Sequence, residues 1–468
     1  MRTTRVMCLS ALMCALSAAP LAAQRAKTPV RTLTPPVATS TPFGSVTDVR
    51  EIGGGRLLVN SSGDRTLALL DASLGHATVL ADTAGASRTT YQRGTKLIPY
   101  LGDSTLMVEF ESRALVMIDP DGKLGRVLAP PRPQDFNSLT SGGPVGVDAR
   151  GRLIYQSGRV FTRPPTCSIG GDSTHTLSTK EKGDSVFLIR ADFDTRGVDT
   201  IGRSQIVPFG AGFPVAIANA QCKIVSARYR IDPSVPLTDS WTVTSRGDVA
   251  VVRGHDYHID WIGSDGARRS TAKLPFDWRR LTDADKGAKV DSARHVVDSL
   301  LVAGGYQLQS CMGGRMTTFS VNPPASPSSG GGASGSGSGS GAAGVTTAFT
   351  FSGGGGGGGG APSTSDCQKI QATPVFAPID SMADYIAPIR EGSARADREG
   401  NVWILPTTSL TARGGLLYDV VNPDGELVER VQLPADRDIA AFGRGGVLYL
   451  SHRTAQGTTI EKVKIVRS

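Results

Sequence analysis

The stretch from Val46 to Leu80 contains four short apolar runs, which glycine, aspartate, asparagine and serine residues separate from one another. Each run is too short for a typical helix and the chain-breaking residues recur too often, so the pattern predicts antiparallel strands joined by turns. A single sheet of this size cannot bury both of its faces. We therefore expect further sheets elsewhere in the chain that pack against it.

A short pattern that marks the second strand of this sheet recurs along the chain. It consists of two small or polar residues followed by three that are mostly apolar, and it occurs six times, at 55–59, 104–108, 151–155, 247–251, 400–404 and 445–449. Three of the five spacings between copies are 45 to 49 residues, the length of a four-stranded propeller blade. The other two, of 96 and 153 residues, require insertions.

This repetition predicts an all-β fold, a six-bladed β-propeller of four-stranded antiparallel meanders. A two-sheet sandwich is the alternative, but it does not need the same pattern at every repeat. The last blade supplies only three strands, whereas Val30–Pro35 resembles the fourth strands of the other blades. We expect this N-terminal strand to close the ring, because the pairing removes two exposed strand edges.

Two parts of the chain resemble the repeat of the NHL-type six-bladed β-propellers. They are Pro144–Tyr155, and Ser393–Leu405 followed by Leu417–Leu433. The resemblance covers the blades but not the insertions, and it implies the same six-bladed ring. NHL-like propellers bind proteins, nucleic acids or ligands and a minority are enzymes, so the fold alone assigns no function.

The N-terminus has the features of a secretory signal peptide. Arg2 and Arg5 precede an apolar run over 6–21, and small residues follow up to Ala23. We expect a signal peptide at 1–23 and a single propeller domain over 24–468, secreted or periplasmic after cleavage. Cleavage lowers the formal net charge from +8 to +6, which is mild for this length. We expect no nucleic-acid partner, no membrane span and a monomer.

The longest insertion covers 276–390 and lies between the fourth and fifth repeats. It contains a glycine- and serine-rich segment, 322–365, which has too few apolar residues to fold and is predicted to be a disordered loop. Residues 345–351 form an apolar island within it, either a sticky patch or a strand added to a sheet edge. Before the loop, apolar residues at helical spacing predict one helix over 283–303.

Four cysteines remain after signal cleavage, and an oxidising compartment favours disulfides between them. They allow three pairings. We predict a Cys311–Cys367 bond, because these residues bracket the glycine-rich segment, and a Cys167–Cys222 bond as the other pair. A zinc site is the weaker alternative, since no two of these cysteines form a CxxC motif.

One cluster of metal-ligand side chains occurs within a predicted strand. Asp256, His258 and Asp260 alternate and would share one strand face, so they could hold a divalent metal. The alternative interpretation is that they form hydrogen bonds within or between blades. Asp148 and Asp397, and more loosely Asp48, precede a second strand, and a following glycine favours turn capping over a metal role. We expect no cofactor, with a divalent metal as the alternative.

The insertions predict where a partner would bind. In a four-stranded meander, segments 157–185, 203–239 and 276–390 all emerge at the same end of the ring, and insertions gathered on one face of a repeat protein often mark its binding face. Arginine and aromatic residues in loops at this end are the candidate binding residues: Tyr91, Arg93, Arg132, Arg253, Trp278, Arg279, Arg280 and Arg413. The arginines could instead be solvated loop charges.

Two functions are compatible with these features. The first is an exported, non-catalytic binding or scaffold propeller that recognises a protein or a carbohydrate-like surface through this face. The second is an exported hydrolase or lyase, similar to lactonases, with a metal site in the central channel. The sequence contains no GxSxG, HExxH or Walker A motif, so it leans towards the binding protein.

Overall fold

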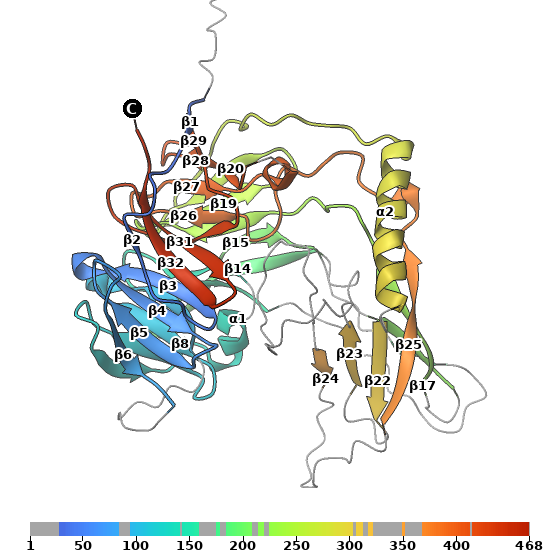
Figure 1. Cartoon of the computed structure of the whole chain (residues 1–468), viewed down its shortest axis with the longest axis horizontal. Helices are drawn as coiled ribbons and strands as arrows, with labels where there is room; N and C mark the ends of the chain where they lie inside the picture. The colour runs from blue at the N-terminus through green and yellow to red at the C-terminus, as the bar shows by residue number, and fades with distance from the viewer. Residues whose placement is uncertain are drawn as a thin grey trace, which may run out of the picture.

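In the computed structural model the chain forms a ring of antiparallel sheets with an accessory module at one side (Figure 1). The structure describes residues 28–83, 94–140, 143–158, 175–177, 184–207, 214–219, 224–302, 306–311, 317–321, 349–351, 367–411 and 414–467. The predicted signal peptide therefore lies outside the described residues. None of the helices in the described part of the chain has the length and apolar character that a membrane crossing requires.

The ring consists of six blades, as predicted. Blade one contains β3 (Val46–Ile52), β4 (Arg56–Ser61), β5 (Thr66–Leu70) and β6 (Ala77–Ala81). Blade two contains β7 (Gly94–Pro99), β8 (Thr105–Glu109), β9 (Ala114–Ile118) and β10 (Leu124–Leu128). Blade three contains β11 (Val145–Val147), β12 (Leu153–Gln156), β14 (Ser185–Ala191) and β15 (Val198–Gln205). Blade four contains β18 (Ser240–Val243), β19 (Val249–Arg253), β20 (His258–Ile262) and β21 (Arg268–Ser270). Blade five contains β26 (Ala394–Ala396), β27 (Val402–Ile404), β28 (Leu417–Val421) and β29 (Leu427–Gln432). Blade six contains β30 (Arg437–Phe442), β31 (Val447–Thr454) and β32 (Gly457–Lys464).

The N-terminal segment closes the ring, as the sequence predicted. Strand β2 (Ala38–Thr39) pairs antiparallel with β32 and so becomes the fourth strand of blade six. The pairing differs in detail from the predicted strand over 30–35, because β1 (Val30–Arg31) instead pairs in parallel with β29 of blade five. Pro35 and Pro36 lie between the two short strands, and proline cannot donate the hydrogen bonds of a continuous ladder.

Apolar side chains fill each interface between neighbouring blades. Alternate residues of a strand point to opposite faces of its sheet, so one strand serves two interfaces. In blade one, Leu57 and Val59 belong to a buried cluster with Tyr449 of blade six. Leu58, between them, belongs to a cluster with Met107 of blade two. The interface of blades six and one is thus packed like the others, and the ring is closed.

The alternation of strand directions gives the ring two different ends. The links between blades and the turns between second and third strands lie at one end, which we call the link end. The turns between first and second strands and between third and fourth strands lie at the other, which we call the turn end. Segments inserted at links therefore leave from the link end.

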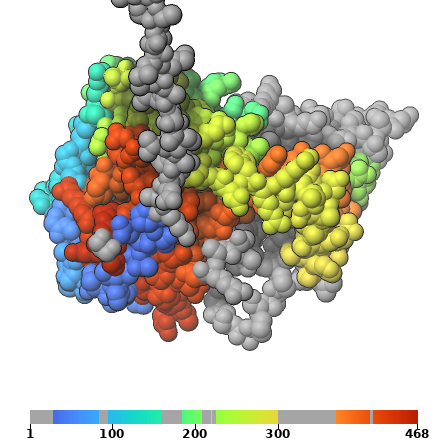
Figure 2. Space-filling model, turned by 90° about the horizontal axis from the view of Figure 1, so that it is seen from above, coloured from blue at the N-terminus to red at the C-terminus, as the bar shows by residue number. Residues whose placement is uncertain are grey.

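Three separate insertions pair to form one accessory sheet. They are the connection between β12 and β14, the link between blades three and four, and the link between blades four and five. The sheet order is β13 (His175–Leu177), β16 (Pro214–Ala218), β17 (Ile224–Ile231), β25 (Cys367–Phe376), β22 (Tyr306–Cys311), β23 (Thr317–Val321) and β24 (Phe349–Phe351). Together with helix α2 (Asp283–Val302) this sheet forms the inserted module, which projects to one side of the ring (Figure 2).

The inserted module both confirms and extends the predictions. Helix α2 matches the helix that the sequence predicted over 283–303. The sheet was not predicted, because its strands are far apart in the chain and pair only in three dimensions. Strand β24 lies within the apolar island 345–351 and pairs with β23, which is the edge-strand interpretation of that segment. A short helix, α1 (Phe136–Thr140), has five residues and packs into the buried cluster between blades two and three.

Candidate functional site

The inner strands of the blades surround a central channel with a volume of about 2510 Å³. Adjacent inner strands contact one another around the ring, from β3 through β7, β11 and β18 to β26 and from β30 back to β3. Arg395 of β26 donates hydrogen bonds to the carbonyl oxygens of Ile439 and Ala440 in β30, which joins the last pair. The residue that lines the channel at β11 is the small Gly146, whereas β3, β7 and β26 line it with charged side chains.

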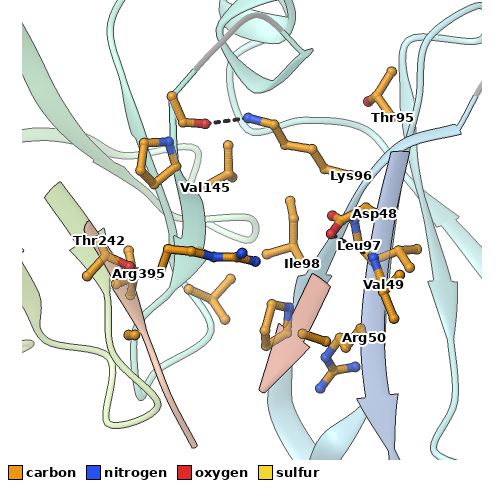
Figure 3. A pocket seen from close by; sticks show the side chains of 18 of the residues that line it. Asp48, Val49, Arg50, Thr95, Lys96, Leu97, Ile98, Val145, Thr242 and Arg395 are labelled. Carbon is orange, nitrogen blue, oxygen red and sulfur yellow. Dashed lines mark hydrogen bonds between the residues drawn. The ribbon is translucent and has the colours of Figure 1, made fainter. Parts of the chain in front are cut away.

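Three charged side chains from different blades form what we call the inner cluster: Asp48, Lys96 and Arg395 (Figure 3). The Asp48 carboxylate accepts hydrogen bonds from the backbone N–H groups of Val49, at 2.9 Å, and Leu97, at 2.8 Å. The Lys96 ammonium donates a hydrogen bond to the backbone carbonyl of Gly143, and the Arg395 side chain points into the same space from the opposite wall. Alternation along the inner strands thus directs charges from three blades into one space.

Burial perturbs the acid and the base of this cluster in opposite directions. It raises the pKa of Asp48, against the hydrogen bonds from Leu97 and Val49 and the charges of Arg395 and Lys96. Burial also lowers the pKa of Lys96 to about 8, although the nearby Asp48 charge opposes this shift. The channel therefore holds a carboxylic acid and an amine whose affinities for a proton are closer than usual, which is a typical condition for proton transfer.

A second charged group lies where the channel opens at the turn end. Its members, Arg50, Asp103, Arg398 and Arg444, form what we call the arginine cluster. The Asp103 carboxylate lies 3.3 Å from Arg50, 3.5 Å from Arg398 and 3.2 Å from Arg444. Burial and then the charge of Arg398 lower the pKa of Arg50 to about 10. One carboxylate is thus shared among three guanidinium groups.

The predicted turn caps are confirmed for two aspartates. Asp148 accepts hydrogen bonds from the backbone N–H groups of Arg150 and Arg152, each at 3.0 Å. Asp397 accepts equivalent bonds from Glu399, at 3.0 Å, and Asn401, at 2.8 Å. Their oxygens are therefore committed to the local turns.

The predicted metal-ligand trio forms a hydrogen-bonded chain in blade four. The imidazole Nδ1 of His258 lies 2.7 Å from Asp256, and Nε2 lies 3.2 Å from Asp260. Burial alone would raise the pKa of Asp260, but hydrogen bonds from Ser270 and Arg253 lower it. Within the described ranges no group of three or more histidine, cysteine or acidic residues could hold a metal. The contacts match the hydrogen-bonding interpretation.

The candidate binding residues fall into three sets. Tyr91, Arg93 and Arg413 lie outside the described residues. Arg132 and Arg253 are held in ion pairs, with Asp135 at 2.6 Å and with Asp239 and Asp260 at 2.7 Å each. The third set lies on the stem, residues 271–282, which connects blade four to the inserted module: Trp278, Arg279 and Arg280. Arg280 forms a backbone bridge with Tyr385 there.

The stem carries a series of aromatic rings in edge contact. The ring centroids of Tyr257 and Phe276 lie 5.7 Å apart, those of Phe276 and Trp278 5.2 Å, and those of Trp278 and Tyr385 6.4 Å. The series begins in the fully buried core of blade four and ends at Trp278 and Tyr385, which are 38% and 44% exposed. Arg279, which is 67% exposed, borders it and forms an ion pair with Asp285 at 3.3 Å.

Neither charged group of the channel was expected from the sequence. The sequence predicted a turn cap for Asp48, but this residue lies within β3 and its carboxylate accepts hydrogen bonds from Val49 and Leu97. Lys96 looks like an ordinary polar position of a strand, and only ring closure brings it close to Asp48. The arginine cluster had a readable signal, because the first turn of each of blades three to six contains an arginine: Arg150, Arg246, Arg398 and Arg444. A recurring charge at equivalent turns of a closed ring predicts a charged channel mouth.

No family model matches the chain, and no curated protein matches it. Among solved structures, it is similar to a streptogramin B lyase, at 11% identity over 92% of this chain and 97% of that one, with a TM-score of 0.34. It is also similar to virginiamycin B lyase from Staphylococcus aureus, at 9% identity over 90% and 96%, with a TM-score of 0.33. The PQQ-bound aldose sugar dehydrogenase from Streptomyces coelicolor is 11% identical over 93% and 97%, with a TM-score of 0.30. These scores are too low to support a functional argument, so the propeller assignment rests on the strand pairing of this chain.

Proposed function

We propose that this chain is an exported, non-catalytic binding propeller that recognises a protein or carbohydrate-like surface through the inserted module. The observation that carries this proposal is the assembly of three separate insertions into one sheet at the link end. Insertions gathered on one face of a repeat ring often form its binding surface.

The strand pairing of the module favours a built surface over a set of independent loops. Strand β13 pairs with β16, where His175 lies opposite Ala218. Strand β17 pairs in parallel with β25, where Ala227 lies opposite Ala372. Each pairing joins segments that are distant in sequence and must offset the entropy of closing a long loop. The blades are already complete without these strands, so the sheet adds a surface beyond what the ring needs.

The stem supplies side chains suited to recognition. Trp278 and Tyr385 present aromatic surface, and Arg279 presents an exposed guanidinium beside it. Tryptophan, tyrosine and arginine are the residues that most often dominate binding energy at interfaces. The fixed fork of an arginine also suits acidic groups on the partner.

The proposal is tested by capture of the partner on immobilised protein from the envelope fraction of the source organism. We expect the R279E/R280E variant to lose capture while its melting temperature stays unchanged, because both positions lie on the stem. The matched control is K123E/R126E, which reverses two exposed charges at the outer edge of blade two. Equal capture by R279E/R280E and wild type would contradict the assignment of the binding face.

A second candidate function is a hydrolase or lyase with its site in the channel. It is favoured by the inner cluster, where a carboxyl group and an amine with opposite pKa shifts face one cavity. Turnover of a lactone or ester panel would support it if D48N and K96M both abolished turnover and R279E/R280E did not. A dependence on added divalent metal would point to the metal-assisted form of this reaction.

A further inference from the structure

The channel mouth at the turn end, opposite the link end where the insertions leave, concentrates positive charge. Three turns between first and second strands each contribute an arginine to the channel lining there: Arg246, Arg398 and Arg444. Arg50, from the inner strand of blade one, adds a guanidinium on the channel wall. The repeat places these residues around one opening, because each belongs to the same end of its blade.

The ion pairs of the arginine cluster are longer than the tightest ion pairs of the same protein, and similar to pairs such as Arg279–Asp285 at 3.3 Å. The distances from Asp103 to its three arginines are 3.2 to 3.5 Å. By comparison, Arg253 lies 2.7 Å from Asp239 and Arg430 lies 2.8 Å from Asp419. Charge-assisted hydrogen bonds between guanidinium and carboxylate groups are typically about 2.7–2.9 Å long. A single carboxylate thus serves three guanidinium groups without a close contact to any of them.

Two other nearby carboxylates, those of Glu51 and Glu399, are engaged elsewhere. Glu51 accepts a hydrogen bond from the Tyr449 hydroxyl at 2.8 Å and another from the backbone N–H of Arg444 at 3.2 Å. Its closest approach to a guanidinium of the cluster is 4.0 Å, to Arg398. Glu399 accepts a 2.9 Å hydrogen bond from the backbone N–H of Gly445. Asp103 is therefore the carboxylate that lies closest to the three guanidinium groups of the cluster.

The backbone at Asp103 supports a specific role for its carboxylate. Asp103 has a φ of +63°, in the left-handed region that is unfavourable for most residues other than glycine. The preceding Gly102 has the same φ, so the turn bends sharply. This bend holds the carboxylate between arginines from blades one, five and six.

We propose that this mouth binds a small, multiply charged oxyanion that carries phosphate or carboxylate groups. Arg444, which is 68% exposed, and Arg246 would receive the ligand at the rim. Arg50 is only 6% exposed and lies on the channel wall, so only a group that enters the opening can approach it. A broad acidic protein surface cannot enter the opening and therefore cannot reach Arg50. Asp103 acts as the internal counter-ion and competes with the bound anion.

The test uses pyrophosphate and citrate as probes, titrated calorimetrically at constant ionic strength with sodium chloride as the reference salt. We expect wild type to bind at least one probe and R444Q to bind it roughly ten-fold more weakly, since a hydrogen bond to a charged group is lost. R246Q, at an exposed rim position, should also weaken binding. D103N should bind more tightly, because it removes the competing charge, and asparagine tolerates the left-handed backbone. The preferred probe distinguishes a phosphate from a carboxylate ligand.

The matched control is R126Q, which removes an exposed arginine from the outer edge of blade two and should bind like wild type. R279E/R280E should also bind the probes normally, which separates this site from the proposed partner surface. The proposal is overturned if wild type binds neither probe, if R126Q loses as much affinity as R444Q, or if D103N binds more weakly. Binding of poly-L-glutamate without binding of either probe would overturn it in favour of an acidic polymer.

Discussion

The Tyr257 hydroxyl donates a 2.9 Å hydrogen bond to the Asp419 carboxylate across the interface between blades four and five. The second carboxylate oxygen accepts a 2.8 Å bond from Arg430. Burial raises the pKa of Asp419, against the charge of Arg430 and the hydrogen bond from Tyr257. A comparable bond joins Tyr449 of blade six to Glu51 of blade one. Polar bonds inside apolar interfaces favour one relative position of the blades, because a shifted blade would leave a buried carboxylate unpaired.

We predict that Tyr257→Phe lowers the free energy of unfolding by about 1–3 kcal/mol, because Asp419 remains buried with one fewer partner. The measurement is chemical denaturation followed by tryptophan fluorescence. Tyr385→Phe is the control, since Tyr385 is 44% exposed and the loss of an exposed hydroxyl should change stability by less than about 0.5 kcal/mol. Equal effects of the two substitutions would show that the interface bond contributes little.

The pKa shift of Lys96 predicts a pH dependence of stability. Its pKa is about 8 in the folded protein and about 10.4 in an unfolded chain. Between these values the unfolded state binds more protons, so the free energy of unfolding rises with pH. We expect wild type to gain stability relative to Lys96→Met from pH 8 to pH 10, by up to about 1.4 kcal/mol per pH unit.

Denaturant unfolding of both proteins at several pH values in this window tests the prediction. The control is Lys123→Met, which removes an exposed lysine from blade two and should show no such trend relative to wild type. A constant stability difference between wild type and Lys96→Met across the window would mean that Lys96 is not desolvated in the channel.

The fold could be predicted because its signal is local. Each blade repeats a glycine turn before its second strand, as at Gly151 and Gly400, which both have positive φ angles. The sheet of the inserted module gives no such signal, since β22 pairs with β25 across a long intervening segment. The inner cluster was hidden for a related reason. Asp48 and Lys96 lie on different blades, and their proximity depends on the curvature of the whole ring.

The register of the inserted sheet bears on the predicted Cys311–Cys367 disulfide. The two residues lie directly opposite each other where β22 pairs antiparallel with β25. Opposite residues in such pairs have Cα atoms about 4.5–5.5 Å apart, within the range of about 4.4–6.8 Å that a disulfide spans. We predict that this bond forms under oxidising conditions and stabilises the protein by about 4 kcal/mol in the chain-entropy account. The other predicted pair, Cys167 and Cys222, lies outside the described residues.

Peptide mapping without reduction would detect the bond directly. We expect one cross-linked peptide that contains Cys311 and Cys367, and a lower melting temperature after substitution of both by alanine. Recovery of either cysteine bonded to Cys167 would show that the predicted pairing is wrong.

Ring closure by the N-terminal segment predicts different effects for two truncations. Removal of residues 28–43 deletes β2 and the backbone hydrogen bonds that this segment makes to blade six, such as that of Phe43 to Thr458 at 2.9 Å. It also removes Phe43, which is buried between blades six and one. We expect a loss of about 4 kcal/mol or more from these terms together. The shorter truncation, of residues 28–32, removes β1 with its contacts on blade five and one hydrogen bond from Val466 to the Thr32 carbonyl, and should cost much less.

Thermal melting of the two truncated proteins and of the untruncated protein measures the difference, and light scattering measures association. The longer truncation exposes the edge of β32, and an unpaired edge strand promotes association between chains. We therefore expect it both to lower the melting temperature by many degrees and to increase scattering, whereas the shorter truncation stays monodisperse. If both proteins melt together, closure of blade six by β2 contributes no more stability than the single parallel contact of β1.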